Sequence, residues 1–139
     1  FSYYSIDCGN GVMSESQDLP RDVAEANVAQ NPPVYFERNL RTIEAITRAH
    51  GIRLMLSTWA YEEANPDGLP FWQAAVAEHN AIIMRLKDEL DVLFVDYAPQ
   101  APQARENWSD YVHMSSMGSR HQAETYAAYL DEVGVLRGE

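Results

Sequence analysis

The sequence has few basic residues and almost no cysteine. Cys8 is the single cysteine among 139 residues, which excludes an internal disulfide and a metal site built from several thiolates. Ten lysines and arginines stand against twenty-one aspartates and glutamates, and the formal net charge is -11 at pH 7. A surface of this charge would repel a phosphate backbone. The composition therefore predicts that nucleic acid is not a partner.

Long apolar runs are also missing. No stretch approaches the roughly 20 apolar residues of a membrane-spanning helix, so we expect no transmembrane segment. The first residues lack the basic region followed by an apolar region that marks a secretory signal. Because Phe1 is not an ordinary translation start, we expect further residues upstream. The sequence assigns neither a compartment nor an oligomeric state.

The remaining composition is that of a folded protein. Hydrophobic residues make up 46% of the chain and charged residues 22%, as in packed domains and unlike disordered segments. We expect a single domain over residues 1–139, a length at which one hydrophobic core can form.

Hydrophobic periodicity predicts helices that alternate with short strands. Two long segments carry apolar residues at three- and four-residue steps, the first ending at Gly51, and a compact β-favouring run follows each of them. This alternation predicts an α/β fold, with a parallel sheet and helices on both of its faces. The predicted helices cover 34–51, 70–90 and about 116–133, and the predicted strands cover 1–7, 52–59 and 91–97.

Two further local patterns predict structure. Residues 12–33 are polar and rich in proline, so we expect a long surface excursion in which only 21–30 could form a short helix. Ser119 and Gln122 have the spacing of a capping box for the last helix.

The segment "WSDYVHMSSMG" (108–118) contains the candidate catalytic residues. It follows the last predicted strand and precedes the last helix, where loops of an open α/β sheet converge on ligands. Asp110 lies three residues before His113, and a carboxylate that accepts the Nδ1–H of a histidine suits the ring to act as a general base. The alternative is that Asp110 is a helix cap or a solvated charge.

The sequence offers little for a metal. No H-x-H or H-x-x-x-H spacing is present, so we predict no metal site, with a cluster of Asp7, Asp96 and Asp110 at strand ends as the alternative. The other histidines each lie on a predicted helix and are interpreted as structural: His50, His79 and His121.

The segment from Trp108 also resembles the C-terminal block of the SGNH (GDSL-type) hydrolases, a family of esterases and lipases, in which D-x-x-H is followed by glycine and an alanine-rich helix. Residues 34–61 and 78–98 are similar to the family's middle helices and strands, so the resemblance covers about 34–131. It implies a flavodoxin-like three-layer α/β/α sandwich, incomplete at its N-terminus, and a serine hydrolase without metal or organic cofactor.

The resemblance also implies roles and a substrate class. Asp110 would orient His113, and His113 would deprotonate the nucleophile and later protonate the leaving group. The substrate would be a small-molecule, carbohydrate or lipid ester.

The chain departs from the family at the nucleophile. The family's serine lies in a G-D-S motif that is absent here, and none of Ser2, Ser5, Ser14 and Ser16 has a matching context. The block with the oxyanion-hole glycine is absent too. In "CGNG" (8–11) a one-residue shift lets Asn10 take the place of the oxyanion-hole asparagine, and a simple N-G turn is the alternative.

We therefore expect this chain to carry the Asp-His part of a Ser-His-Asp triad and to be inactive alone, the parent protein being an ester hydrolase. The alternative is a non-catalytic SGNH-like binding or assembly domain that lacks the nucleophile.

Overall fold

The computed structural model describes residues 4–6, 13–15, 21–30, 32–64 and 70–137. The chain divides into two compact units, residues 1–32 and residues 33–139. Each unit is described by itself.

The first unit contains a strand hairpin and a helix. Strand β1 (Tyr4–Ile6) pairs antiparallel with β2 (Met13–Glu15), and helix α1 (Arg21–Gln30) follows. The helix confirms the prediction for 21–30, whereas β2 is a strand in the stretch 12–33, for which no strand was predicted. The prediction that the first strand belongs to the parallel sheet is wrong for the residues described, because β1 pairs with β2. The joining segment 7–12 is shorter than the dozen or so residues that a parallel crossover needs.

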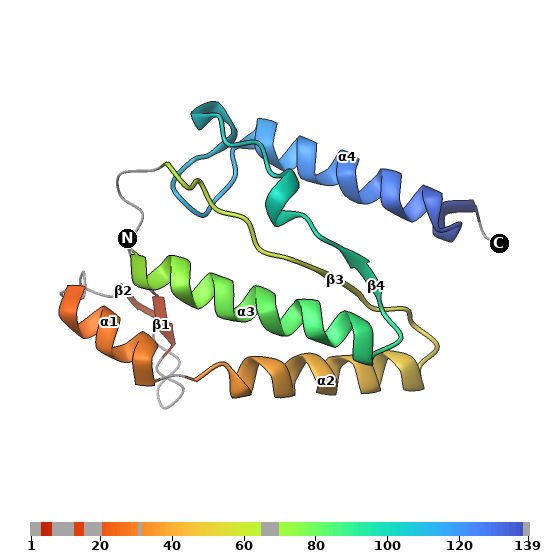
Figure 1. Ribbon diagram of the computed structural model, residues 1–139, viewed down its shortest axis with the longest axis horizontal. Coiled ribbons are helices and arrows are strands. Elements are labelled where there is room, and N and C mark those ends of the chain that lie inside the picture. The colour runs from red at the N-terminus through yellow and green to blue at the C-terminus, as the bar shows by residue number, and fades with distance from the viewer. Residues whose placement is uncertain (1–3, 7–12, 16–20, 31, 65–69, 138–139) are drawn as a thin grey trace. The chain divides into compact units, whose positions relative to one another are not determined.

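The second unit alternates helices and strands as the periodicity predicts (Figure 1). Strands β3 and β4 pair in parallel, with Met55 opposite Leu93 and Ser57 opposite Val95. A mixed α/β fold with parallel pairing is thus confirmed, whereas the three-layer sandwich stays a prediction. The elements are α2 (Val34–Ala49), β3 (Met55–Ser57), α3 (Pro70–Glu89), β4 (Leu93–Val95), the 3-10 turns η1 (Ala98–Gln100) and η2 (Arg105–Asn107), α4 (Ser116–Glu132) and the 3-10 turn η3 (Val135–Arg137).

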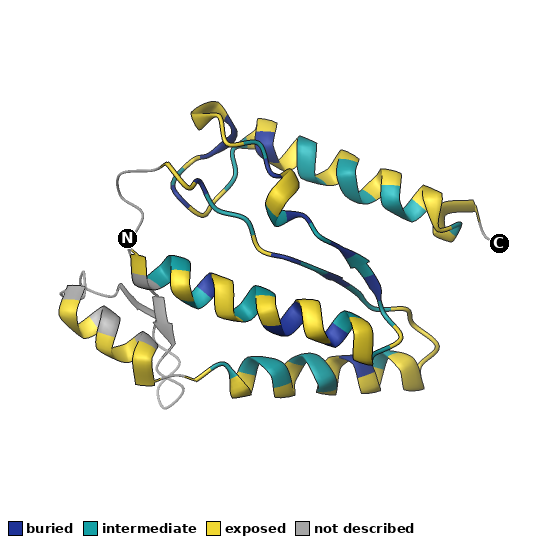
Figure 2. Ribbon diagram, viewed as in Figure 1, coloured by how far each residue is buried: buried dark blue, intermediate teal, exposed yellow. Residues whose placement is uncertain are grey.

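Helices lie on both sides of this strand pair. In Figure 1, α2 and α3 lie side by side on one side of β3 and β4, and α4 lies on the other. Alternate strand residues face opposite sides. Leu56 accordingly packs against α3, and Val95 joins the cluster that contacts α4. Figure 2 shows buried residues along the two strands, on the part of α3 nearest to them, and in the loops at the start of α4.

Two tyrosines hold α4 to the strands. The Tyr126 hydroxyl donates a hydrogen bond to Ser57 Oγ at 2.8 Å. The backbone N–H of Phe94 donates to the Tyr129 hydroxyl at 3.0 Å. Both partners lie in the strands, so these contacts join α4 to β3 and to β4 by side-chain hydroxyls.

The helix ends follow local rules with one correction. Gly51 adopts a φ of 68°, which glycine accepts without strain, and ends α2 as predicted. The predicted capping box is wrong, because α4 begins earlier. Its N-cap is Ser115, whose hydroxyl accepts hydrogen bonds from the N–H groups of Met117 and Gly118.

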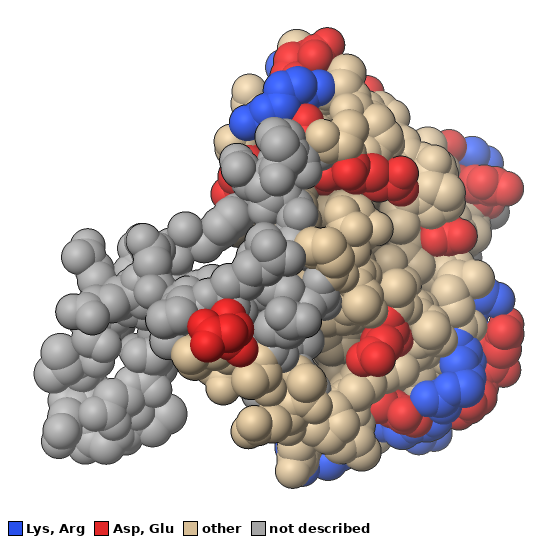
Figure 3. Space-filling view, turned by 60° about the vertical axis from the view of Figure 1, so that its left-hand side comes forward, with Lys and Arg blue, Asp and Glu red and all other residues tan. Residues whose placement is uncertain are grey.

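Charged side chains pair where α2 meets α3. Glu37 accepts hydrogen bonds from Arg85 at 2.7 Å and from Arg41 at 2.9 Å, and both arginines also pair with Glu89. On the face shown in Figure 3, basic side chains of the described residues lie beside acidic ones, and other acidic side chains stand alone. The described part of that face therefore offers no extended basic patch, as the net charge suggests.

Candidate functional site

The segment between η2 and α4 forms a small closed loop. An antiparallel bridge between Trp108 and Met114 closes residues 109–113. Within it, the Ser109 N–H donates a hydrogen bond to the carbonyl oxygen of His113 at 2.7 Å. Trp108 is buried, and its indole N–H donates to the Pro102 carbonyl at 2.8 Å. One end of the loop is thus anchored in the core, Tyr111 in its middle is also buried, and Val112 and His113 are exposed.

The loop brings Asp110 and His113 together. Nδ1 of His113 lies 2.7 Å from Oδ2 of Asp110. The other carboxylate oxygen, Oδ1, accepts hydrogen bonds from the backbone N–H groups of Val112 at 2.9 Å and His113 at 2.8 Å. Because an ionised carboxylate can only accept, Nδ1 carries the proton and Nε2 is the basic nitrogen of the neutral ring.

The electrostatics of the pair favour the ionised carboxylate. Partial burial by itself would raise the pKa of Asp110, but hydrogen bonds from the Val112 N–H, the His113 imidazole and the His113 N–H outweigh it and hold the pKa below its usual value. The His113 side chain is 73% exposed and that of Asp110 39%. A proton donor or acceptor from outside can therefore reach the ring.

Asp110 is not a helix cap in this structure. Ser115 caps α4, and the Asp110 carboxylate is engaged by its own loop. This geometry excludes the alternative that Asp110 caps the last helix. The catalytic role of the two residues stays a prediction.

The start of α4 fixes the other end of the loop. The Ser115 N–H donates to the carbonyl oxygen of Asn107 at 2.9 Å, and its hydroxyl donates to that of Glu106 at 2.7 Å. A Cβ atom on Gly118 would lie 2.2 Å from the Asn107 carbonyl oxygen. Only glycine therefore lets the first turn of α4 approach η2 this closely.

Polar groups also meet at the carboxyl ends of β3 and β4. The buried Thr58 hydroxyl donates to Asp96 Oδ1 at 2.8 Å and accepts a hydrogen bond from the Ala98 N–H at 2.9 Å. Asn80 of α3 forms two hydrogen bonds with the backbone of Trp59, at 2.8 and 2.9 Å. These contacts fix the segments that leave the two strands.

The acidic cluster predicted as an alternative metal site does not form among the described residues. Asp96 is engaged by Thr58, Asp110 by His113, and Asp7 lies outside the described residues. In the described ranges no group of three or more His, Cys, Asp or Glu could hold a metal ion.

The nucleophile and the oxyanion hole are not placed by the structure. Asn10, Ser2 and Ser16 lie outside the described residues, and Ser5 and Ser14 lie opposite each other in the hairpin of the first unit. Among the residues described, no serine hydroxyl lies within hydrogen-bond distance of the His113 ring. The serines nearest to it in sequence bond to backbone carbonyls, Ser109 to Met114 and Ser115 to Glu106.

The remaining histidines lie in structural surroundings. His50 is the C-cap of α2. The His79 ring centroid lies 4.3 Å from that of Phe36, and His121 Nδ1 lies 3.3 Å from the Tyr97 hydroxyl. These positions support the interpretation that the three histidines serve packing and capping.

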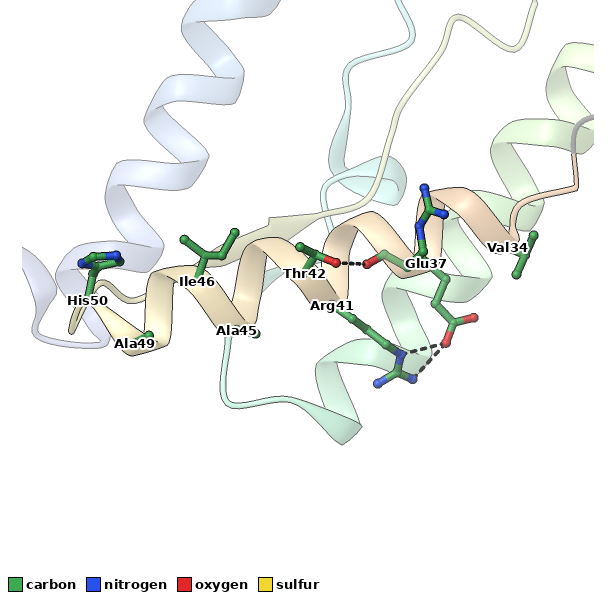
Figure 4. A pocket seen from close by; sticks show the side chains of 9 residues that line it. Val34, Glu37, Arg41, Thr42, Ala45, Ile46, Ala49 and His50 are labelled. Atoms are coloured by element: carbon green, nitrogen blue, oxygen red, sulfur yellow. Dashed lines mark hydrogen bonds and ion pairs between the residues drawn. The ribbon is translucent and has the colours of Figure 1, made fainter.

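A hollow of about 760 Å³ lies elsewhere, along the outer side of α2 (Figure 4). In the close-up, Arg41 points toward Glu37 at one edge of the hollow, whereas Ile46 and the nearby alanines give it an apolar wall. No residue of the 109–113 loop lines it. We therefore place the candidate site at the loop and not in this hollow. The hollow is lined by Val34, Glu37, Arg38, Arg41, Thr42, Ala45, Ile46, Ala49 and His50.

Two residues near the loop were missed by the sequence reasoning. Arg105 in η2 and the buried Glu62 after β3 both contact its backbone. Glu62 and Arg105 are too far apart in the chain for any local spacing to link them. The sequence could have pointed to them only by their position, since both lie in segments that follow a predicted strand.

Comparisons with known proteins add no assignment. No protein-family model, curated protein or solved structure matches the chain. In the part of the chain that the structure describes, no helix combines the length and apolarity of a membrane-spanning segment.

Proposed function

We propose that this chain carries the histidine-aspartate part of a serine ester hydrolase of the SGNH type. The observation that carries the proposal is the 2.7 Å contact between His113 Nδ1 and Asp110 Oδ2, on an exposed loop at the start of α4. The contact sets the tautomer in which Nε2 can take a proton. The parallel α/β arrangement of β3 and β4 supports the sandwich fold that this family would require.

The proposed reaction uses His113 twice. Nε2 accepts the proton of a serine hydroxyl as the serine oxygen attacks the ester carbonyl, and the imidazolium then donates that proton to the departing alcohol. Water attacks the acyl-serine in the same way, with Nε2 first taking and then returning a proton. Asp110 stays ionised throughout and stabilises the imidazolium.

The serine and the oxyanion hole lie outside the residues described. We propose Asn10 as one oxyanion donor, a contribution on the order of 3 kcal/mol for such a group. The substrate class is an ester of a small molecule, a carbohydrate or a lipid.

The test uses the full-length translation product of the gene. We expect it to hydrolyse p-nitrophenyl acetate, His113→Ala to abolish that activity, and His50→Ala, at an exposed helix end, to retain it. Activity that survives His113→Ala would remove the assignment. The 139-residue chain alone is expected to be inactive, because a triad without its serine keeps little rate enhancement.

A non-catalytic binding or assembly domain is the second candidate. It is favoured by the lack, among the described residues, of a serine hydroxyl near His113. A fluorophosphonate probe separates the two, since it labels an activated serine covalently. Labelling that His113→Ala prevents supports the hydrolase, and no labelling of the full-length product supports the binding domain.

A further inference from the structure

Arg105 links the base of the 109–113 loop to a buried acid. From η2, its Nη1 donates a hydrogen bond to the carbonyl oxygen of Trp108 at 2.6 Å, and its Nη2 donates to that of Ser109 at 3.3 Å. The same guanidinium lies 3.7 Å from Oε2 of Glu62. The planar fork of arginine can hold two carbonyls and a carboxylate at once, whereas an ammonium group cannot match this geometry.

Glu62 contacts the same loop a second time. Its backbone N–H donates to the carbonyl oxygen of Tyr111 at 2.9 Å. The Glu62 side chain is only 5% exposed, and a buried carboxylate needs a cation or hydrogen-bond donors close by. Glu62 thus places a carboxylate beside the half-exposed Arg105 guanidinium, at ion-pair but not hydrogen-bond distance, and holds the middle of the loop with its backbone.

The catalytic pair depends on the backbone that these contacts hold. The N–H groups that bind Asp110 Oδ1 belong to Val112 and His113 of the same loop. Val112 and His113 are exposed, whereas the neighbouring Tyr111 is buried, so packing holds the middle of the loop and hydrogen bonds hold the residues on either side of it. The carboxylate can therefore face the imidazole only while the loop keeps its shape.

We propose that Arg105, oriented by Glu62, is a positioning residue for the Asp110-His113 pair. Its hydrogen bonds to residues 108 and 109 set the loop conformation in which the carboxylate meets Nδ1. The effect on catalysis rests on the proposed hydrolase function, whereas the effect on the pair itself does not.

NMR of the 139-residue chain tests this without any activity. The two readouts are the exchange rate of the His113 Nδ1 proton and the pKa of the Asp110 carboxyl. We expect Arg105→Met to speed the exchange on the order of tenfold and to raise the pKa of Asp110 toward its usual value, because the N–H donors are no longer held. Arg105→Lys keeps the charge without the fork and should give a smaller change, and Glu62→Gln a change in the same direction.

The matched control is Arg137→Met, which removes another arginine-carboxylate pair, with Asp131, near the opposite end of α4. It should leave both readouts unchanged. Unchanged readouts in folded Arg105→Met would overturn the proposal. If Arg105→Met unfolds, the same two readouts are measured in folded Arg105→Lys and Glu62→Gln. If all three variants unfold globally, Arg105 and Glu62 have a structural role only and the proposal is overturned.

The outcomes also separate the two proposals. If the His113 Nδ1 proton is not protected in the wild-type chain, the Asp110-His113 pair is not formed, and the hydrolase proposal is contradicted as well. If the pair is formed but Arg105→Met changes neither readout, only the positioning role is overturned. In the full-length product, Arg105→Met should lower kcat with little change in KM, and Arg105→Lys should restore part of the loss.

Discussion

Asp110 meets His113 by both of its carboxylate oxygens, one on the imidazole Nδ1 at 2.7 Å and one on the backbone N–H at 2.8 Å. The two residues are only three positions apart, so the contact closes within one short loop, whose backbone is in turn held by Arg105 and Glu62. The result is an oriented imidazole that solvent can reach. This arrangement leads to the first of four predictions.

Asp110→Asn should disable the pair while leaving the fold intact. The amide can still accept from the backbone, but it no longer holds the Nδ1–H tautomer or stabilises the imidazolium. In the full-length product we expect kcat for p-nitrophenyl acetate to fall by about 10²- to 10⁴-fold. Asp131→Asn, which alters an exposed carboxylate paired with Arg137, serves as the control. A variant as active as wild type would exclude Asp110 from the mechanism.

Gly118→Ala should destabilise the protein, against the usual trend in helices. Alanine normally stabilises a helix by about 1 kcal/mol relative to glycine. Here its Cβ would lie 2.2 Å from the Asn107 carbonyl oxygen, and the backbone would have to shift. We expect a loss of about 1–3 kcal/mol in the free energy of unfolding, measured in urea. The exposed Ser119→Ala is the control, and a stabilised Gly118→Ala would contradict the packing described.

Thr58→Val should cost stability although the shape of the side chain is kept. The change leaves Asp96 Oδ1 and the Ala98 N–H without their buried partner. Unsatisfied buried groups cost about 1–3 kcal/mol, and because Asp96 and Ala98 are half-buried we expect a loss toward the lower end of that range, which urea unfolding can resolve. Thr42→Val is the matched control, since its hydroxyl bonds to the Arg38 carbonyl at an exposed site. Equal effects of the two variants would show that the Thr58 network adds nothing.

Glu37 should make stability depend on pH in the acidic range. Hydrogen bonds from Arg85 and then Arg41 lower the pKa of Glu37 from 4.5 to about 2. The folded-state pKa is depressed, so the contribution to stability is complete above pH 4.5 and is lost as the pH falls from there through about 2.

The measurement is urea unfolding between pH 6 and pH 2. The wild type should lose stability over the lower part of this range, and Glu37→Gln should show a flatter dependence there. Asp91→Asn, at an exposed position after α3, is the control. An identical pH profile for Glu37→Gln would show that these ion pairs are screened by solvent.

Local patterns in the sequence predict much of the second unit. The steps between apolar residues place α2, α3 and α4 to within about two residues of their observed bounds, and Gly51 marks a true helix end. The predicted strands are longer than the three-residue β3 and β4. The Asp-His contact was also predictable, because the two residues share one short loop.

The sequence by itself determined the helices, the order of elements in the second unit and the pairing of Asp110 with His113, because each depends on residues within a few positions of one another. The tertiary structure alone decided that β1 pairs with β2, that Ser115 caps α4, and that Arg105 meets Glu62 beneath the loop. The pairing of β1 and the meeting of Arg105 with Glu62 depend on which segments pack together over long separations. The choice of cap depends on where the chain enters the helix. The periodicity of apolar residues predicts neither the long-range contacts nor the first residue of the helix.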